Sequence, residues 1–254
     1  MHHQRSARRF GIMLHARKIW LSELLSLFIV ITLATTLFVL TWKIVSNETT
    51  IYRKTKRLSM LQADKVLLTH TEKELRGRVA IAELLCSIAG SRIEPDILLE
   101  LSEIVYRNSR KFGYDPLLLL SVIEVESVFD PEARGKYRSG KQSGAFGLMQ
   151  IKPATANEIA TQLGMDSIAL GDLFKPEINV ILGVAYLTTM IERFKSFKLG
   201  ILAYNQGPGV ISKQLSEKSE LSVRYYQRVL TAYYRLKKNS LQLAAAESEE
   251  PVCR

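Results

Sequence analysis

The sequence predicts an all-α protein in which a membrane-spanning helix and a helical spacer precede a compact helical domain. Three observations support this class. Residues 24–45 form one long apolar run. From residue 94 onward, prolines and glycines divide the chain into segments that carry apolar residues at helical spacing. We find no convincing alternation of apolar and polar residues, which is the pattern of half-buried strands.

Residues 24–45 (LLSLFIVITLATTLFVLTWKIV) are predicted to form a retained membrane anchor. Their single charge is Lys43, close to the end of the run. Roughly 20 apolar residues rising about 1.5 Å each cross the hydrocarbon core of a bilayer. Trp20 and Trp42 lie near the two ends, where interfacial tryptophans belong. The alternative is a cleaved signal peptide, but the run is long for that and no A-x-A cleavage site follows it.

The flanking charges leave the orientation of this anchor undecided. The basic residues before and after it are Arg5, Arg8, Arg9, Arg17 and Lys18, and then Lys43, Arg53, Lys54, Lys56 and Arg57. The numbers of basic residues on the two sides are nearly equal, so the positive-inside rule favours neither orientation. We expect residues 1–23 to form a basic cytoplasmic tail, an assignment that rests on the function of the large domain.

Residues 46–93 are predicted to form a helical juxtamembrane spacer. They are rich in helix formers and contain no proline. A leucine-rich stripe recurs every seven residues, at Leu61, Leu68, Leu75 and Ala82. The companion stripe of a heptad repeat is interrupted by Asp64, Thr71 and Arg78. We therefore favour a solvated helix over a dimeric coiled coil.

Residues 94–239 form the predicted compact domain. Its first helix starts at Pro95 and ends at Gly113, and Asp115 caps a second helix ahead of Pro116. Later helices are expected from Pro153 to near residue 164, from Pro176 through PEINVILGVAYLTTMIERF, through LGILAYNQG, and through VRYYQRVLTAYYRL. Residues 240–254 are acidic and are expected to form a flexible tail.

The formal net charge of +10 suits nucleic acid, an anionic membrane surface or an anionic cell-wall polymer. The sequence has no zinc-finger spacing, RNA-binding aromatic motif or Walker loop, so nucleic acid is not an expected partner. Cys86 and Cys253 form no metal-binding spacing with the four histidines, and no metal or organic cofactor is expected. A disulfide between the two cysteines and two free thiols both remain open.

Glu126 is the candidate catalytic residue. It lies at the end of the apolar segment LLLLSVIEVES, which has the composition of a core helix. A carboxylate there is either paired or kept partly protonated by desolvation, and the second state is what a general acid needs near neutral pH. Glu124 lies about 200° away around the helix and cannot face the same cleft. Asp130-Pro131 ends the helix and leaves Glu126 beside a loop.

Two glycine-containing loops supply the other candidate site residues. The stretch GAFGLMQIKPATA, residues 144–156, returns towards Glu126, with Gln150 as an amide donor for a sugar and Met149 as an apolar wall. The stretch AYNQGPG supplies Tyr204 and Asn205, and Tyr225 lies in the last helix. Aromatic faces, amides and one shielded carboxylate are typical of a carbohydrate cleft. Core packing remains the alternative for each tyrosine taken alone.

Together these segments resemble the lytic transglycosylase family with the goose-type lysozyme-like fold. The family has Glu-Ser, Gly-Leu-Met-Gln followed by Pro-x-Thr-Ala, Asn-x-x-x-Gly-x-x-Tyr-Leu, Ala-Tyr-Asn-x-Gly-Pro-Gly, and a Tyr-x-x-x-Val helix. This chain has Glu126-Ser127, GLMQIKPATA from Gly147, NVILGVAYL from Asn179, AYNQGPG from Ala203, and Tyr225 to Val229. One motif alone would be weak evidence, whereas five in the same order are specific.

The resemblance implies cleavage of the β-1,4 bond between N-acetylmuramic acid and N-acetylglucosamine in peptidoglycan. Glu126 would protonate the glycosidic oxygen and then, as a base, take the proton from the muramic C6 hydroxyl, which closes a 1,6-anhydro ring. The implied substrate-binding residues are Ser127, Gly147, Met149, Gln150, Tyr204, Asn205 and Tyr225. The implied setting is the bacterial inner membrane, with the catalytic domain in the periplasm. The expected partners are peptidoglycan glycan strands and the membrane, with envelope or secretion-complex proteins as further candidates.

Two alternatives stay open at this point: a hydrolytic muramidase on the same fold, and an inactive peptidoglycan-binding membrane anchor. A two-carboxylate glycosidase needs a second acid across the cleft. No Asp or Glu falls inside the loop motifs that should face Glu126. We expect Asp130 and Glu132 to point outward, whereas Asp166 or Asp172 could fold in. Glu126 beside all the loop motifs argues against the inactive form.

The chain departs from the family pattern after Glu126-Ser127. The family's link is Ala-x-Ser-x-x-Gly-Ala, and here it is ARGKYRSGKQSGA, which is several residues longer. The added residues include the basic Lys136, Arg138 and Lys141. They would either hold the anionic peptides of the wall or form a solvated bulge, and we favour the bulge. Ser139 and Ser143 are equal candidates for the family's serine.

Overall fold

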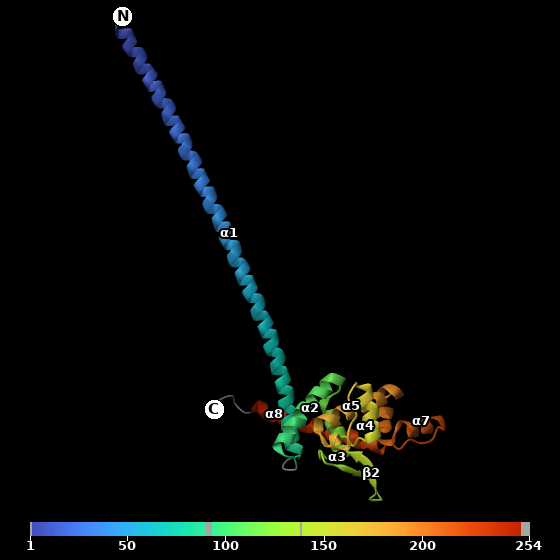
Figure 1. Cartoon of the computed structure of the whole chain (residues 1–254). Coiled ribbons are helices and arrows are strands. Elements are labelled where there is room, and N and C mark those ends of the chain that lie inside the picture. The colour runs from blue at the N-terminus through green and yellow to red at the C-terminus, as the bar shows by residue number, and fades with distance from the viewer. Residues whose placement is uncertain (1, 90–92, 138, 250–254) are drawn as a thin grey trace. The chain divides into compact units, whose positions relative to one another are not determined.

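The computed structural model describes residues 2–89, 93–137 and 139–249. Arg138 and Cys253 lie outside these residues. Helices dominate the described chain (Figure 1), and the predicted all-α class is confirmed. In chain order the elements are α1 (His2–Ala89), α2 (Pro95–Phe112), α3 (Pro116–Ser127), β1 (Arg134–Lys136), β2 (Gln142–Phe146), α4 (Pro153–Gln162), η2 (Leu170–Phe174), α5 (Pro176–Phe194), α6 (Phe197–Gln206), α7 (Pro208–Ser216) and α8 (Arg224–Glu249).

The chain divides into two compact units, Met1–Thr71 and Glu72–Arg254. In the first unit, α1 contains the one helical stretch of the described chain that is long and apolar enough to cross a membrane, and the side chains of its most apolar part are not buried. The hydroxyls of Thr32, Thr36 and Thr41 donate to carbonyls three residues earlier, at 2.9 Å. Such bonds leave these side chains without an unpaired donor in an apolar environment.

The second unit includes the end of α1. Ile81, Leu84, Leu85 and Ala89 are buried in its hydrophobic core. The core of this unit therefore contains residues that the sequence assigned to the spacer.

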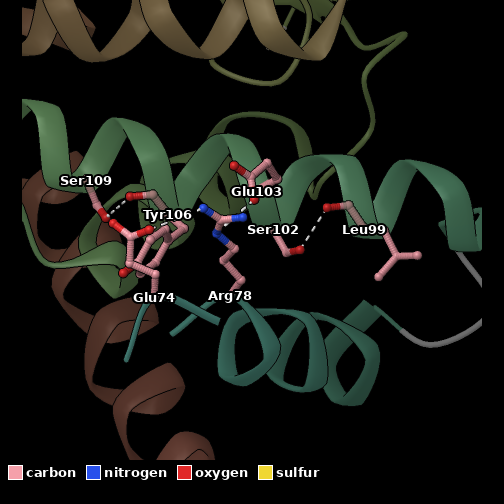
Figure 2. A network of polar contacts seen from close by, with 7 residues as sticks. All are labelled: Glu74, Arg78, Leu99, Ser102, Glu103, Tyr106 and Ser109. Atoms are coloured by element: carbon pink, nitrogen blue, oxygen red, sulfur yellow. Dashed lines mark hydrogen bonds and ion pairs between the residues drawn. The ribbon is translucent and has the colours of Figure 1, made fainter. Parts of the chain in front are cut away.

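Polar and aromatic contacts join this end of α1 to α2 (Figure 2). The Arg78 Nε atom lies 3.1 Å from Glu103 Oε2, and its guanidinium lies 5.6 Å from the centre of the Tyr106 ring. A Cβ at Gly77 would lie 2.4 Å from Tyr106 Cε2, so this glycine allows the ring to pack against the backbone of α1.

The predicted helix starts at Pro95, Pro116, Pro153 and Pro176 are confirmed. Proline suits the first turn of a helix because the amide hydrogen that it lacks would have no intrahelical partner there. The Asp115 carboxylate accepts a hydrogen bond from the Leu117 amide at 2.9 Å and caps α3 as expected.

Helix α3 ends earlier than the Asp130-Pro131 pair. Val128 and Phe129 both adopt positive φ angles, 56° and 65°, a conformation that is costly for residues with large side chains. The Phe129 side chain is buried, and its packing offsets this cost.

Helix α5 occupies the centre of the second unit, where it packs against α2, α4, α6 and η2. Its inward side chains include Val180, Leu182, Val184 and Leu187, all with no exposed surface. Helices α3 and α8 pack against each other, and α6 packs against α7 and α8. The lower part of Figure 1 shows this group of helices with the β2 strand beside them.

Three features differ from the sequence prediction. Strands β1 and β2 pair as an antiparallel hairpin with Arg134 opposite Phe146 and Lys136 opposite Gln142. Helix α7 follows the break at Gly207, which has φ 89°. Helix α8 continues to Glu249, so residues 240–249 are helical rather than loose, and Leu243 packs against the core.

Candidate active site

Glu126 lies near the end of α3 and is held by a hydrogen bond from α8. The Tyr225 hydroxyl donates a hydrogen bond of 2.5 Å to Glu126 Oε1. Burial raises the pKa of Glu126 from 4.5 to about 7, although the Tyr225 hydrogen bond and the positive charge of Arg228 act in the lowering direction. A pKa near neutrality makes both the protonated and the ionised form of this carboxyl accessible, so that it can both give and take a proton.

Glu124 faces away from this site, as the helix geometry predicted. Its carboxylate forms an ion pair with Arg235 of α8. It is not among the residues that line the cleft around Glu126. The two glutamates of α3 therefore have different environments: Glu124 is paired with Arg235, and Glu126 lines the cleft.

The loop at residues 147–150 is built around the buried Asn179 of α5. The Asn179 amide donates to the carbonyls of Phe146 and Leu173, at 2.9 and 2.8 Å, and its Oδ1 accepts from the Met149 amide at 2.7 Å. A Cβ at Gly147, which has φ 75°, would lie 2.2 Å from the Leu173 carbonyl oxygen. The glycine thus brings its backbone close to α5 and η2.

Met149 is fully buried and does not form a wall of the cleft. A Cβ at Gly183 would lie 2.4 Å from its sulfur, so the side chain fills the space that this glycine leaves on α5. Its carbonyl instead accepts a hydrogen bond of 2.7 Å from the Tyr204 hydroxyl. The prediction that Met149 forms an apolar wall of the cleft is therefore wrong, because its side chain packs into the core while its backbone carbonyl contacts a cleft residue, Tyr204.

Ser127 and Gly147 are also buried outside the cleft lining. The Ser127 hydroxyl donates to the Ile123 carbonyl at 3.1 Å, which ties it to its own helix. Gln150 does line the cleft, but its amide nitrogen donates to the carbonyls of Ala133 and Gly147, at 3.1 and 2.8 Å. Only the side-chain oxygen of Gln150 remains to accept a hydrogen bond from a ligand.

The cleft beside Glu126 is open to solvent and has a volume of about 580 Å³. Its walls come from α3, the β1–β2 hairpin, the residues between β2 and α4, the first turn of α4, α5, the α6–α7 junction, and α8. The residues that matter for its chemistry are Glu126, Lys136, Tyr137, Gln150, Lys152, Tyr186, Tyr204, Asn205 and Arg228. Tyr225 lies behind Glu126 and is not part of the lining.

Glu126 is the only carboxylate among the described residues that line this cleft. Asp130, Glu132, Asp166 and Asp172 all lie outside it. Asp130 accepts from the Glu132 amide in a local turn, and Asp172 pairs with Lys175 at 2.8 Å. None of these acids is therefore placed across the cleft from Glu126.

The sequence interpretation missed Tyr137, Lys152, Tyr186 and Arg228 as cleft residues, and it favoured a solvated bulge for Lys136, which lines the cleft. Arg228 could have been found from the sequence, because it lies three residues after Tyr225 and therefore on the same side of a helix.

Burial raises the pKa of Tyr204 and of Tyr225 well above the usual value for tyrosine, so both hydroxyls stay protonated as donors. In the described parts of the chain, no group of three or more His, Cys, Asp or Glu side chains could hold a metal ion.

The sequence model of the transglycosylase SLT domain matches residues 103–227. This segment is similar to SLT domains. The match confirms the resemblance to the lytic transglycosylase family, and it contains Glu126, Tyr204, Asn205 and Tyr225.

Curated relatives of the chain include two membrane-bound enzymes by name. Membrane-bound lytic murein transglycosylase E of Buchnera aphidicola subsp. Acyrthosiphon pisum is 28% identical over 154 residues, or 56% of this chain and 66% of that protein. Membrane-bound lytic murein transglycosylase C of Glaesserella parasuis serovar 5 is 31% identical over 119 residues, or 42% of this chain and 31% of that protein. The chain therefore spans less than two thirds of these relatives.

Solved structures with a similar arrangement include an inactive mutant of lytic transglycosylase Slt from Pseudomonas aeruginosa, with a TM-score of 0.46 and 24% identity over 66% of this chain and 30% of that one. The 70 kDa soluble lytic transglycosylase of Escherichia coli has a TM-score of 0.44 and 22% identity over 65% of this chain and 29% of that one.

Proposed function

We propose that this chain is a peptidoglycan lytic transglycosylase. It cleaves the β-1,4 bond between N-acetylmuramic acid and N-acetylglucosamine and leaves a 1,6-anhydromuramic product. The observation that carries the proposal is a single desolvated carboxyl, Glu126, in an open cleft of an SLT domain. The printed names of the relatives, which are lytic murein transglycosylases, support the substrate class.

Glu126 acts in both halves of the reaction. In its neutral form it gives a proton to the glycosidic oxygen while the bond from that oxygen to C1 of muramic acid breaks. The resulting carboxylate then takes the proton of the C6 hydroxyl, and the C6 oxygen bonds to C1. The proton that Glu126 gave is thereby returned, and no water is consumed.

The surroundings of Glu126 suit this exchange of roles. A pKa of about 7 keeps both the acid and the base form accessible near neutral pH. The Tyr225 hydroxyl and the Arg228 charge favour the carboxylate that exists between the two steps. Tyr204 holds the Met149 carbonyl and thereby fixes the loop that carries Gln150.

The arrangement of acids supports the non-hydrolytic reaction over a two-carboxylate hydrolysis. Two-carboxylate glycosidases place their acids about 5–10 Å apart across the substrate. Glu126 is the only carboxylate among the described residues of the cleft lining. The substrate itself, through its C6 hydroxyl, supplies the nucleophile that a second acid would otherwise have to activate from water.

Sugar binding falls to the polar and aromatic residues of the lining. Asn205 and the free oxygen of Gln150 offer hydrogen bonds to hydroxyl or N-acetyl groups, and Tyr137 and Tyr186 offer ring faces. Ser127, Gly147, Met149 and Tyr225 act behind this surface by shaping the helix end, the loop and the carboxyl.

Release of soluble muropeptides from purified sacculi tests the assignment as an enzyme. The full-length chain in mild detergent should solubilise sacculi over hours, as measured by chromatography of the supernatant. Tight binding to sacculi with no soluble product, by a chain shown to be folded, would instead favour an inactive wall-binding anchor.

The pH dependence of the reaction should respond to Tyr225→Phe. Removing the hydroxyl removes an interaction that lowers the pKa of Glu126, so this pKa should rise above 7. Because Glu126 must be protonated to act as the acid, the alkaline limb of kcat/KM should move to higher pH by several tenths of a unit or more. Tyr226→Phe on the neighbouring position is the control, since Tyr226 makes no hydrogen bond with Glu126. An unchanged limb would mean that Tyr225 does not influence the titrating group.

We further propose that α1 anchors the enzyme in the inner membrane with the SLT domain in the periplasm. The exposed apolar part of α1 and the membrane-bound relatives support attachment to a membrane. Deleting residues 1–45 should move the protein from the membrane pellet to the soluble fraction without loss of specific activity. A truncated chain that still sediments with membranes would contradict the anchor assignment.

A further inference from the structure

The β1–β2 hairpin is attached firmly to the cleft wall. At its base, the Gly147 amide and the Gln150 side chain both donate to the Ala133 carbonyl, at 2.9 and 3.1 Å. The Arg134 guanidinium lies 5.0 Å from the centre of the Phe174 ring, and the Phe146 ring packs edge-on against the same ring at 5.7 Å. These contacts fix the base of the inserted segment to η2 and to the loop that carries Gln150.

The backbone of the hairpin approaches the cleft closely because residue 135 is glycine. A Cβ at Gly135 would lie 2.2 Å from Ser143 Oγ and 2.5 Å from Gln150 Oε1. The next two residues, Lys136 and Tyr137, line the cleft together with Gln150. The interpretation of this insertion as a solvated bulge is therefore wrong for Lys136 and Tyr137, whereas residues 139–142 are exposed and lie outside the cleft lining.

The cleft has an excess of positive charge. Lys136, Lys152 and Arg228 line it, and Glu126 is the one described acid among the lining residues. Lys136 and Lys152 are exposed, and neither makes an ion pair with another residue in the described parts of the chain. A cleft with unpaired cations attracts and holds anionic ligands.

The glycan backbone does not account for these lysines. Its N-acetylglucosamine rings are neutral, and the lactyl group of muramic acid is neutral once it is joined to a peptide. The negative charges of a peptidoglycan strand are the free carboxylates of the peptide stems that leave these lactyl groups. Lysine suits such mobile carboxylates because its ammonium group binds them without a fixed relative orientation.

We propose that Lys136 and Lys152 bind carboxylates of the peptide stem, so that the cleft prefers glycan strands that carry stems over strands from which the stems have been removed. The inference rests on the proposed function and narrows its substrate class. The hairpin, through Lys136, and the residue before α4, Lys152, thus act together as a specificity element.

The test compares two soluble, uncrosslinked glycan preparations, one with intact stems and one stripped by an amidase. The full-length chain in detergent should cleave stem-bearing strands with roughly a tenfold higher kcat/KM. Exposed ion pairs are individually weak, so each lysine should account for about a two- to fivefold part of this preference. The Lys136→Gln/Lys152→Gln variant should lower the ratio of the two kcat/KM values to about 1–2, and added salt should lower the ratio of the parent chain.

The matched control is Lys141→Gln/Lys218→Gln, which removes the same charge from exposed positions outside the cleft lining and should keep the ratio. Equal cleavage of both strands by the parent chain, or an unchanged ratio in the cleft variant, would overturn the inference and leave the proposed function intact. Cleavage of neither strand would instead overturn the proposed function. In that case binding of the Glu126→Gln chain to the two strands, each immobilised on beads, still decides whether the cleft recognises stems.

Discussion

The Glu126→Gln chain is expected to lose turnover by at least about 10³-fold, because the proposed mechanism uses this one carboxyl as both acid and base and general acid–base catalysis alone contributes about 10²–10⁴-fold. Glutamine keeps the shape of the side chain and can still accept the Tyr225 hydrogen bond. Binding to sacculi should therefore change little. The measurement is the rate of muropeptide release under conditions that saturate the parent enzyme. Glu124→Gln is the matched control, since Glu124 pairs with Arg235 outside the cleft lining.

The same substitution should also increase stability in a pH-dependent way. The pKa of Glu126 in the folded chain, about 7, lies above its ordinary value of 4.5, so the folded state binds the proton more tightly than the unfolded state. Ionisation of Glu126 therefore does not lower the free energy of unfolding below pH 4.5. It lowers this free energy progressively between pH 4.5 and 7, and by a constant amount above pH 7. Glutamine removes a cost of up to about 3 kcal/mol, at about 1.4 kcal/mol per pKa unit.

Two outcomes would contradict this account of Glu126. Turnover of the Glu126→Gln chain close to the parent rate would exclude Glu126 as the proton donor. A difference in unfolding free energy between variant and parent that is the same at pH 4 and pH 8 would show that the carboxyl does not titrate with a raised pKa in the folded chain.

A chain that begins at residue 94 is expected to fail to fold, whereas one that begins at residue 72 should fold. Removal of residues 72–93 deletes Ile81, Leu84, Leu85 and Ala89 from the core. Losing one buried leucine side chain costs about 2–5 kcal/mol, and whole domains are stable by only about 5–15 kcal/mol. Thermal unfolding followed by circular dichroism measures the difference.

Point substitutions in the chain that begins at residue 72 separate the effect of core packing on stability from the effect of chain length. Leu85→Ala should lower the free energy of unfolding by about 2–4 kcal/mol, because this side chain has no exposed surface. Leu75→Ala, in the same helix, should change it by less than about 0.5 kcal/mol, because its side chain is 59% exposed. A cooperative transition at the same temperature for fragments 72–254 and 94–254 would show that the end of α1 is only a connector.

Local signals in the sequence were sufficient to predict where four helices start and that Glu124 and Glu126 face different sides of their helix. Proline at positions 95, 116, 153 and 176 marks a first helical turn whatever packs around it. The divergence of Glu124 and Glu126 depends only on helix geometry. The apolar residues before Glu126 likewise predicted a shielded carboxyl, and its pKa is raised by burial.

Features that depend on long-range contacts were not predictable in this way. The direction of the Met149 side chain is decided by the space at Gly183, far away in the sequence. The hairpin has strands of three and five residues, too short for a clear alternation, and its position depends on Phe174 and Gln150. Lys152 could be recognised as a cleft residue only from the structure, in which it lines the same cleft as Lys136.

The most direct test of the central claim is the mass of the muropeptides released from purified sacculi, measured before and after borohydride reduction. A transglycosylase that uses the C6 hydroxyl as its nucleophile leaves 1,6-anhydro products, which are one water lighter than hydrolysis products and unchanged by borohydride. This result is expected for the parent chain. Products that borohydride reduces would contradict it, because they would require a water nucleophile and an acid–base arrangement other than Glu126 alone.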